Sequence, residues 1–220
     1  ICIDIDIKKL RINNIYHNFK MKKILITGGT GYLGRNLALF YKKKYKVFLG
    51  ARNNKQNFLV KNLTNCEVVP LDVSNINSVN DCLNYTKPDI VIHAAAMKHV
   101  HLAEYNPMEC VKTNINGAMN LIDACIDQKV KKVVALSTDK ASSPINLYGA
   151  TKLASDKLFV ARNSSYAGGH KTCFSIVRYG NVMGSNGSVM PFFLNKRAEG
   201  VLPITDKRMT RFNISLEDGC

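Results

Sequence analysis

The chain has 220 residues, of which 46% are hydrophobic and 21% are charged. This length accommodates one sizeable α/β domain with a buried core and leaves little room for a full second domain. Apolar runs are only about six to eight residues long, far short of the roughly 18 needed to span a bilayer, so no membrane span is expected.

The formal net charge of +15 would suit a nucleic-acid partner. The basic residues are nevertheless scattered singly or in short runs, and no RNP aromatic motif, zinc finger or helix-turn-helix pattern accompanies them. We therefore expect no nucleic-acid partner. Positive charge spread over the surface would also attract a substrate that carries a diphosphate.

The seven cysteines show neither CxxC nor Cys/His metal spacing. They are interpreted as small buried thiols in a reducing cytoplasm, with no metal site. No signal peptide is evident, because Asp4 and Asp6 interrupt the apolar region that one would need. Residues 1–20, which precede Met21, are expected to be an N-terminal extension outside the core domain.

Short runs rich in β-branched residues alternate with longer amphipathic segments. Strands are predicted over Lys23–Thr27, Val47–Ala51, Glu67–Leu71, Ile90–Ala94, Lys132–Ser137 and Cys173–Tyr179. Helices are predicted over Tyr32–Lys43, Ile76–Asn84, Met108–Gln128, Leu147–Arg162 and Ser188–Glu199. Nearly continuous apolar strands are typical of a parallel sheet buried on both faces. The alternation predicts an α/β fold with a doubly wound parallel sheet of the Rossmann type.

A glycine-rich turn, TGGTGYLG over residues 27–34, follows the first predicted strand and opens a helix. This context is the one that a dinucleotide fingerprint requires. Glycine allows positive φ and close approach of the backbone to a pyrophosphate, and the helix N-terminus offers unpaired N–H groups. The alternative is a tight turn without a ligand. The expected cofactor contacts are Gly28, Thr30, Gly31, Tyr32, Leu33 and Gly34.

The second predicted strand ends in a basic turn with Arg52, Asn53 and Lys55. NAD enzymes usually carry an acidic residue here for the ribose 2′-hydroxyl. Its absence, together with the two cations, favours the 2′-phosphate of NADP. A solvated basic loop is the alternative. After the third strand, Asp72 and Val73 are expected to meet the adenine or else to cap the next helix.

Small residues end the fourth predicted strand at Ala94, Ala95 and Ala96. At the carboxyl edge of a parallel sheet they would let a cofactor lie close to the backbone. Lys98 follows them and is expected to contact the cofactor ribose or a substrate phosphate.

A Tyr-x-x-x-Lys pattern follows the fifth predicted strand, which ends in Ser-Thr-Asp-Lys at residues 137–140. The i, i+4 spacing puts Tyr148 and Lys152 on one helix face. A nearby ammonium favours the phenolate, so we expect Lys152 to lower the pKa of Tyr148. Tyr148 would then serve as a base for a substrate hydroxyl.

Together these motifs resemble those of the extended short-chain dehydrogenase/reductases. Within that superfamily they resemble the UDP-N-acetylglucosamine 4,6-dehydratases of bacterial surface-sugar synthesis. Tyr148 is similar to the inverting type, which begins pseudaminic acid synthesis. The resemblance rests on TGGTGYLG, HAAAMKHVHLAEYNPMECVKTNINGAMNLIDACI, ALSTDKASSPINLYGATKLASDKLFV, SIVRYGNVMGSNGSVMPFF and LPITDKRMTRF.

The resemblance implies catalytic roles around Thr138. Tyr148, helped by Lys152, would take the proton of the sugar's carbon-4 hydroxyl while hydride passes to NADP. Lys140 would remove the carbon-5 proton, and Asp139 would protonate the leaving carbon-6 hydroxyl. Reprotonation from the opposite face would invert carbon 5. The alternative is an exposed Asp139–Lys140 ion pair without a catalytic role.

The resemblance also implies substrate contacts after the sixth strand. Thr138 and Lys98 would contact the substrate, Asn181 would hold its diphosphate, and Val182 would lie near the nicotinamide. A plain structural role for the Arg208 region is the alternative. The residues expected to contact the nucleotide are Val189, Met190, Arg208 and Arg211.

By the same resemblance, the helices predicted over Met108–Gln128 and Leu147–Arg162 would pair across the interface of a homo-oligomer, a dimer or larger. Residues 21–220 would form an NADP-binding domain with the start of a substrate-binding lobe, truncated at its C-terminal side. Three functions stay open: an inverting dehydratase acting on a UDP-sugar, another epimerase or reductase of the superfamily, and a non-catalytic dinucleotide-binding fragment.

Overall fold

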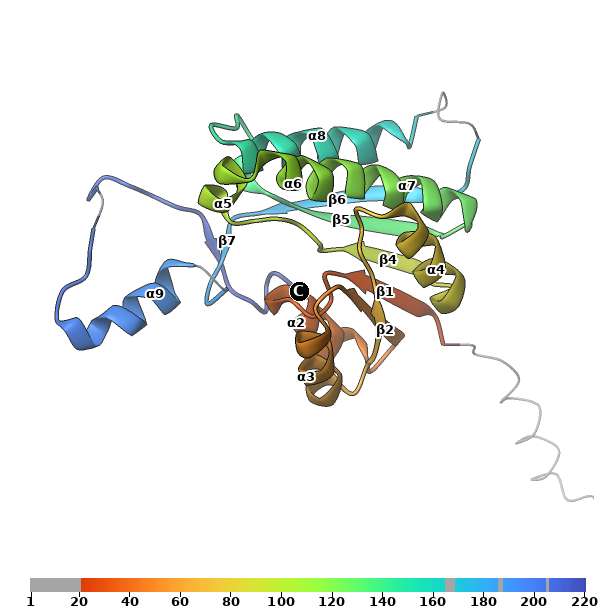
Figure 1. Cartoon of the computed structure of the whole chain (residues 1–220), viewed down its shortest axis with the longest axis horizontal. Helices are drawn as coiled ribbons and strands as arrows, with labels where there is room; N and C mark the ends of the chain where they lie inside the picture. The colour runs from red at the N-terminus through yellow and green to blue at the C-terminus, as the bar shows by residue number, and fades with distance from the viewer. Residues whose placement is uncertain (1–20, 165–168, 186–187, 205) are drawn as a thin grey trace, which may run out of the picture.

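A computed structural model of the chain describes residues 21–164, 169–185, 188–204 and 206–220. The extension expected over residues 1–20 lies outside these ranges. The described residues contain a six-stranded parallel sheet in the order β3-β2-β1-β4-β5-β6 (Figure 1). The doubly wound Rossmann-type sheet predicted from the sequence is confirmed. Its strands are β1 (Lys23–Thr27), β2 (Lys46–Ala51), β3 (Glu67–Pro70), β4 (Ile90–His93), β5 (Lys132–Thr138) and β6 (Cys173–Tyr179).

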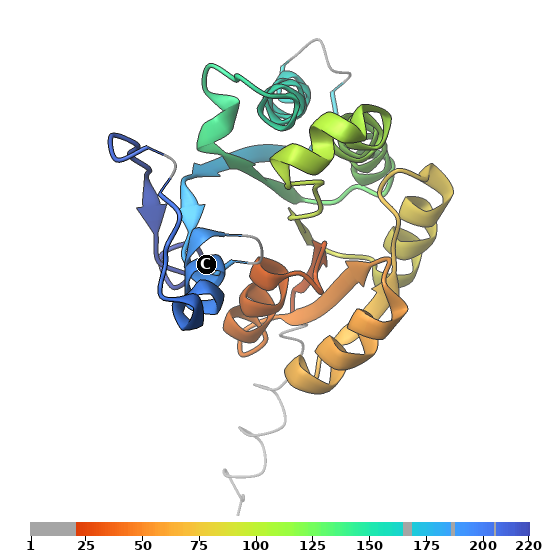
Figure 2. The ribbon, with the colours of Figure 1, turned by 60° about the vertical axis from the view of Figure 1, so that its left-hand side comes forward.

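Helices flank the sheet on both faces (Figures 1 and 2). One layer holds α2 (Tyr32–Tyr41) and α3 (Asn54–Thr64), and the other holds α4 (Ile76–Thr86), α7 (Gly117–Asp127) and α8 (Leu147–Ala161). Right-handed crossovers explain this division: the chain moves outward from β1 to β3, then crosses back to β4 with its later helices on the opposite side. None of the helices in the described part of the chain is long and apolar enough to cross a bilayer.

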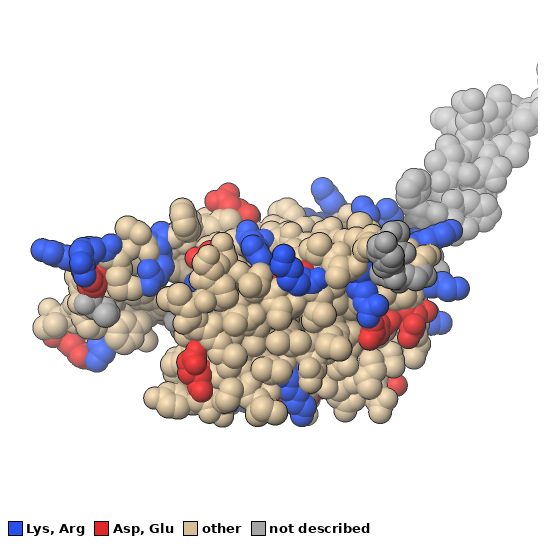
Figure 3. Space-filling model, turned by 90° about the horizontal axis from the view of Figure 1, so that it is seen from above, with Lys and Arg blue, Asp and Glu red and all other residues tan. Residues whose placement is uncertain are grey.

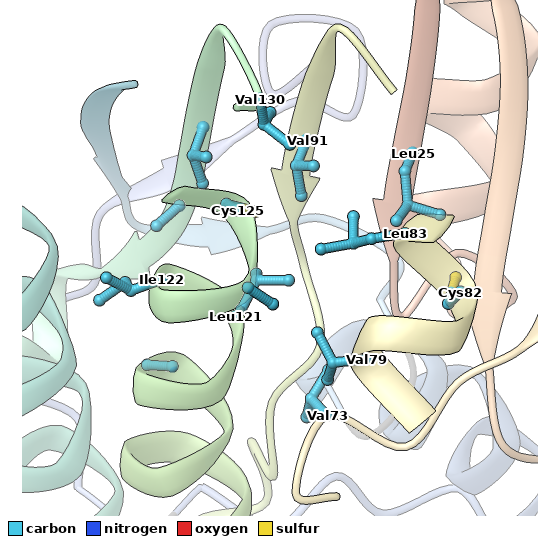
Figure 4. Close-up of a cluster of buried hydrophobic side chains, with 14 of the residues drawn as sticks. Leu25, Val73, Val79, Cys82, Leu83, Val91, Leu121, Ile122, Cys125 and Val130 are labelled. Atoms are coloured by element: carbon cyan, nitrogen blue, oxygen red, sulfur yellow. The ribbon is translucent and has the colours of Figure 1, made fainter. Parts of the chain in front are cut away.

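Successive side chains of β1 enter two different cores. Leu25 packs into the cluster between the sheet and α4, α7 and α8, which Figure 4 shows. Its neighbours Ile24 and Ile26 pack on the other face with Leu37 of α2 and Val60 of α3. Because strand side chains alternate between faces, burial on both faces requires a continuously apolar strand.

The edge strand β6 is not buried on both faces. Cys173, Ser175 and Val177, alternate residues of this strand, are exposed. The reason is the placement of the helices: α8 packs against β6, whereas α2 and α3 of the other layer lie over β1, β2 and β3. The expectation of a doubly buried strand is therefore wrong at this edge.

The single helix predicted over Met108–Gln128 is interrupted. The structure has α5 (Val100–Tyr105), α6 (Pro107–Val111), a π-helical turn η1 (Lys112–Asn116) and then α7. A π turn adds a residue to the local repeat and rotates the side chains that follow it, often at functional sites. Here the turn contains buried Asn114.

Helix α3 is absent from the sequence prediction, which leaves residues 52–55 as a basic loop. Asn53 caps the helix, with its side-chain oxygen accepting the N–H of Gln56 at 2.9 Å. Asn65 ends it in the left-handed region at φ 54°. Asn53 was expected to contact the cofactor, but in this state its side-chain oxygen caps the helix. Lys55 lies in the first turn of the helix.

A small two-stranded sheet follows the main one. Its strands, β7 (Asn181–Val182) and β8 (Asn213–Ile214), pair in parallel. Between them lie α9 (Val189–Lys196) and the 3-10 turn η4 (Arg197–Glu199), within the helix predicted over residues 188–199. The chain then returns to α2, where the Tyr41 hydroxyl donates to the carbonyl of Cys220 at 3.3 Å (Figure 2).

Candidate active site

The segment from the end of β1 into the first turn of α2 has no space for a Cβ at Gly28, Gly29 or Gly34. Gly28 has φ +64°, and a Cβ there would lie 2.8 Å from the backbone of Ala95. A Cβ at Gly34 would lie 2.6 Å from the carbonyl oxygen of Gly28. These contacts require glycine and bring the turn against the residues that follow β4.

The N-terminus of α2 fits the pyrophosphate of a dinucleotide. Gly31 is the N-cap residue, no side chain caps the helix, and the first turn has no acidic residue. A Cβ on Gly31 would meet only the carbonyl oxygen of Gly28, at 3.1 Å, so the backbone is open to close approach from outside. Uncapped N–H groups and the positive end of the helix dipole suit an anion.

A buried hydrogen bond joins the ends of β1 and β4. The Thr27 hydroxyl lies 2.8 Å from Nδ1 of His93 and accepts the N–H of Ala95 at 3.3 Å. Burial, helped by the charge of Lys152, lowers the pKa of His93 to about 3, so its ring is neutral at physiological pH. The sequence places His93 only within the strand predicted over Ile90–Ala94, and its hydrogen bond with Thr27 follows from the packing of β1 against β4.

Just after the carboxyl end of β2, Arg52 lies between two carboxylates. Its Nη1 is 3.4 Å from Glu109 of α6 and 3.8 Å from Asp72. Burial raises the pKa of Asp72, but hydrogen bonds with Ser74 and the charges of Arg52 and Lys112 outweigh burial and leave the pKa lowered. Asp72 bonds Ser74 instead of capping α4. No sequence motif points to Glu109 at this position.

Thr138, Asp139 and Lys140 form a connected group at the carboxyl end of β5, where η2 (Asp139–Ala141) begins. The Thr138 hydroxyl donates to the Asp139 carboxylate at 2.9 Å, and the Lys140 ammonium donates to the same oxygen at 3.1 Å. Burial raises the pKa of Asp139, but the hydrogen bonds with Lys140 and Thr138 leave it lowered. Asp139 is therefore ionised in this state.

Asn181 of β7 joins this group from the second sheet. Its side-chain oxygen accepts a hydrogen bond from Lys140 at 3.0 Å. The backbone N–H of Asn181 donates to the carbonyl of Phe212 at 2.8 Å, so the segment leading into β8 holds it in place. Asn181 thus contacts the Asp139–Lys140 pair, while its contact with a substrate diphosphate stays a prediction.

Tyr148 and Lys152 lie one turn apart on α8, as the spacing predicts. Burial raises the pKa of Tyr148 to about 12, although a hydrogen bond with Thr138 lowers it. Burial lowers the pKa of Lys152 to about 8, against the carboxylate of Asp156, which raises it. Lys152 is not among the groups that shift the pKa of Tyr148, and burial raises that pKa, so the expected lowering by Lys152 is wrong for this state.

Asp156 lies behind this pair and is buried. Its carboxylate accepts hydrogen bonds from the Ser137 hydroxyl and from Nε of Arg178, both at 2.8 Å. These contacts tie α8 to β5 and β6 and place a negative charge one helical turn beyond Lys152. Only the tertiary structure brings these three residues together.

Asn114 holds the loop after β4 against α8. Its side-chain oxygen accepts the N–H of Met97 at 2.8 Å, and its amide donates to the Thr151 hydroxyl at 3.0 Å. Lys98 follows Met97, and desolvation lowers its pKa although the residue as a whole is exposed. The π turn therefore ties the loop after β4 to Thr151 of α8.

Within the described part of the chain, the residues expected to contact the nucleotide of the substrate form no hydrogen bond or ion pair with Asp139, Lys140 or Tyr148. Val189 and Met190 are exposed on α9, which projects from the sheet (Figure 1). Arg208 pairs with Asp206 at 2.7 Å, and Arg211 donates to the carbonyl of Thr210 at 2.7 Å. Both arginines therefore contact residues one or two positions away in the chain, as a structural role would require. Their contact with a nucleotide stays a prediction.

The surface charge is dispersed on the face shown in Figure 3. Lys and Arg side chains appear there as separate groups, with Asp and Glu between them. A nucleic-acid interface commonly gathers its basic residues in one patch or stripe. This face has no such stripe.

The family described as "Polysaccharide biosynthesis protein" matches residues 24–220. The chain is 53% identical over 208 residues to the Campylobacter jejuni (strain 81-176) protein named "UDP-N-acetylglucosamine 4,6-dehydratase (inverting)". That alignment covers 91% of this chain and 62% of the relative, so the chain spans less than two thirds of the relative's length. The Rickettsia conorii protein named "UDP-glucose 4-epimerase" is 40% identical over 210 residues, covering 91% and 61% of the two chains.

Solved structures share the fold. Pen from Bacillus thuringiensis superposes with a TM-score of 0.84 at 43% identity, covering 90% of this chain and 62% of that one. The dTDP-glucose 4,6-dehydratase DesIV from Streptomyces venezuelae, solved with NAD bound, has a TM-score of 0.76 at 24% identity and shows the fold alone; it covers 90% and 69%. The resemblance drawn from the sequence motifs is confirmed. The family match runs from β1 to the last residue, and the chain therefore belongs to the polysaccharide biosynthesis protein family.

Proposed function

We propose that the protein is an NADP-dependent UDP-N-acetylglucosamine 4,6-dehydratase that inverts carbon 5, a hydro-lyase that begins pseudaminic acid synthesis. The observation that carries the proposal is the contact of Lys140 with Asp139, tied through Thr138 to Tyr148. An oxidation at carbon 4 needs only a base such as Tyr148. An elimination also needs an acid and a base at neighbouring carbons, and this pair supplies both.

The proton positions at the pair define its role. In the free chain Asp139 is the ionised partner of Lys140. Transfer of one proton from Lys140 to Asp139 would yield a neutral amine, the base for the carbon-5 proton, and a carboxylic acid, the donor to the leaving carbon-6 hydroxyl. A substrate that excludes water from the pair would favour this transfer, because desolvation penalises the two charges.

Tyr148 would take the proton of the carbon-4 hydroxyl. Its raised pKa keeps the phenol protonated at neutral pH in the free chain. The Lys152 ammonium, which the Asp156 carboxylate favours, would stabilise the phenolate as it forms. When bound, the nicotinamide would accept the carbon-4 hydride and return it to carbon 6.

The cofactor proposal rests on the fit of the chain to a dinucleotide. The glycine turn and uncapped helix α2 suit the pyrophosphate, and Arg52 suits a 2′-phosphate. The other proposed contacts at this edge are Thr30, Tyr32, Leu33, Asn53, Lys55, Asp72, Val73, Ala94, Ala95, Ala96, Lys98 and Val182.

The second lobe would supply the substrate contacts. We assign β7, α9 and β8 to its start, with Asn181, Val189, Met190, Arg208 and Arg211 facing the UDP moiety. We further propose a homo-oligomer in the cytoplasm, without a nucleic-acid or membrane partner. The six described cysteines are free thiols, as a reducing compartment would favour.

The test is incubation with UDP-N-acetylglucosamine and NADP in deuterated water, followed by NMR. We expect a 4-keto-6-deoxy sugar with deuterium at an inverted carbon 5. A keto sugar that retains its carbon-5 proton would contradict the inversion. Absence of any keto sugar from a chain that binds the cofactor would contradict the dehydratase proposal.

A 4-epimerase is the second candidate, favoured by the 40% identity to the Rickettsia conorii protein of that name. Tyr148 and Lys152 alone would support such an activity, because epimerisation at carbon 4 needs no elimination. The same NMR experiment separates the two, since an epimerase would yield a 4-epimer that keeps its carbon-6 hydroxyl.

A further inference from the structure

We infer that Glu109 of α6 is a specificity-determining residue that weakens the preference for NADP over NAD by competing with a 2′-phosphate for Arg52. The inference rests on the proposed dinucleotide function and deepens it. An NAD enzyme of this fold usually carries its ribose-binding carboxylate at the end of β2. This chain has Arg52 there, and α6 brings a carboxylate to the same corner from far along the sequence.

The geometry holds Glu109 toward Arg52. Its Oε1 lies 3.4 Å from Nη1 of Arg52 and accepts the Thr113 hydroxyl at 3.3 Å. The Arg52 and Glu109 side chains are 55% and 47% exposed, so a ligand can reach both. Asp72, the other carboxylate near Arg52, is held separately by Ser74 at 2.7 Å and 2.9 Å.

The charges at this corner oppose one another. Arg52 and Lys112 are positively charged and attract a phosphate; the charge of each lowers the pKa of Asp72. Asp72 and Glu109 are negatively charged and repel a phosphate. A 2′-hydroxyl is neutral and can donate a hydrogen bond to a carboxylate, so Glu109 favours it over a 2′-phosphate. Removing the charge of Glu109 frees Arg52 for the phosphate and leaves the hydroxyl a neutral acceptor that binds it more weakly than a carboxylate does.

The experiment compares binding of 2′,5′-ADP with that of 5′-AMP, and of NADPH with that of NADH, by calorimetry. For Glu109→Gln we expect the preference for the 2′-phosphate ligand to rise about two- to fivefold, the range of an exposed charge pair. The gain should shrink at high salt. Asp123→Asn is the matched control, because it breaks an exposed ion pair between Asp123 of α7 and Arg162 at the end of α8.

A double-mutant cycle makes the test specific. Arg52→Met should lower the preference for 2′,5′-ADP, and Glu109→Gln should have little further effect in that background. An unchanged or lower preference in a folded Glu109→Gln protein would overturn this inference and leave the cofactor proposal standing. A wild-type chain that binds neither dinucleotide would overturn both.

Discussion

At the scale of single residues, burial decides the charge states of Tyr148, Lys152 and His93. It raises the pKa of Tyr148 to about 12, lowers that of Lys152 to about 8 and lowers that of His93 to about 3. In each case desolvation penalises the charged form. The Asp156 carboxylate, bonded to Ser137 and Arg178, is the charge that opposes this effect at Lys152.

His93 makes the fold sensitive to acid. Its folded pKa of about 3 lies below the ordinary value of 6.5. The unfolded chain therefore binds more protons between these values, and stability falls as the pH drops through that window. His93→Asn keeps an acceptor for Thr27 but has no ring to protonate. Between pH 7 and pH 5 we expect its free energy of unfolding to fall by roughly 2 kcal/mol less than that of wild type.

Urea unfolding at several pH values measures this difference. His101→Asn is the matched control, because His101 is exposed and should leave the acid dependence unchanged. An acid dependence in His93→Asn identical to that of wild type would refute the role of His93.

Two substitutions separate the proposed oxidation from the elimination. Tyr148→Phe should lower dehydration by roughly 100-fold or more, because it removes the base at carbon 4. Lys140→Met should block deuterium incorporation at carbon 5 while single-turnover reduction of the cofactor persists. Both effects are read by NMR and nicotinamide absorbance.

Lys131→Met is the control for the loss of a lysine, because Lys131 pairs with Asp89 and is 70% exposed. Equal loss of cofactor reduction in Lys140→Met and Tyr148→Phe would argue against separate roles. Unchanged carbon-5 exchange in Lys140→Met would exclude Lys140 as the base.

At the scale of elements, two glycines between β1 and α2 differ in how much space surrounds them. Gly28 has positive φ and no space for a Cβ, whereas Gly31 has φ −71° and an open outer side. Gly28→Ala should destabilise the fold by roughly 2–4 kcal/mol. Gly31→Ala should change stability by less than about 1 kcal/mol and still weaken dinucleotide binding, because the methyl group intrudes on the pyrophosphate.

Thermal unfolding and calorimetric titration with NADP test the pair of variants. Full affinity in Gly31→Ala would mean that the pyrophosphate does not lie over the α2 terminus. A Gly28→Ala protein as stable as wild type would show that the turn relaxes without cost.

Helices were harder to predict than strands. The period of apolar residues over 108–128 is that of one helix, but a π turn breaks it, with Asn114 bonded to Met97 and Thr151. Helix α3 is defined mainly by its caps at Asn53 and Asn65. Such contacts depend on particular hydrogen bonds, to which a periodicity argument is insensitive.

At the scale of the whole molecule, the main sheet and α9 differ in burial. Both faces of β1 are packed, whereas α9 has no buried residue. Local stability follows such burial. Amide hydrogen exchange should therefore be slow in β1, β4 and β5 and fast in α9, as mass spectrometry of peptides would measure. Equal protection of α9 and β1 would show that the α9 face is covered in solution.

The sequence by itself determined the sheet, the glycine turn and the Tyr148–Lys152 spacing. These features depend on side-chain periodicity or on residues only a few positions apart, so local patterns are sufficient to predict them. The bounds of β1 and β6 agree with the prediction at both ends.

The tertiary structure alone decided which distant residues meet and how they are charged. Glu109 reaches Arg52, and Asn181 reaches Lys140, across separations of 57 and 41 residues. The charge states of Tyr148, Lys152 and His93 likewise follow from what covers them. Desolvation depends on packing from the whole fold, and no local pattern of residues contains it.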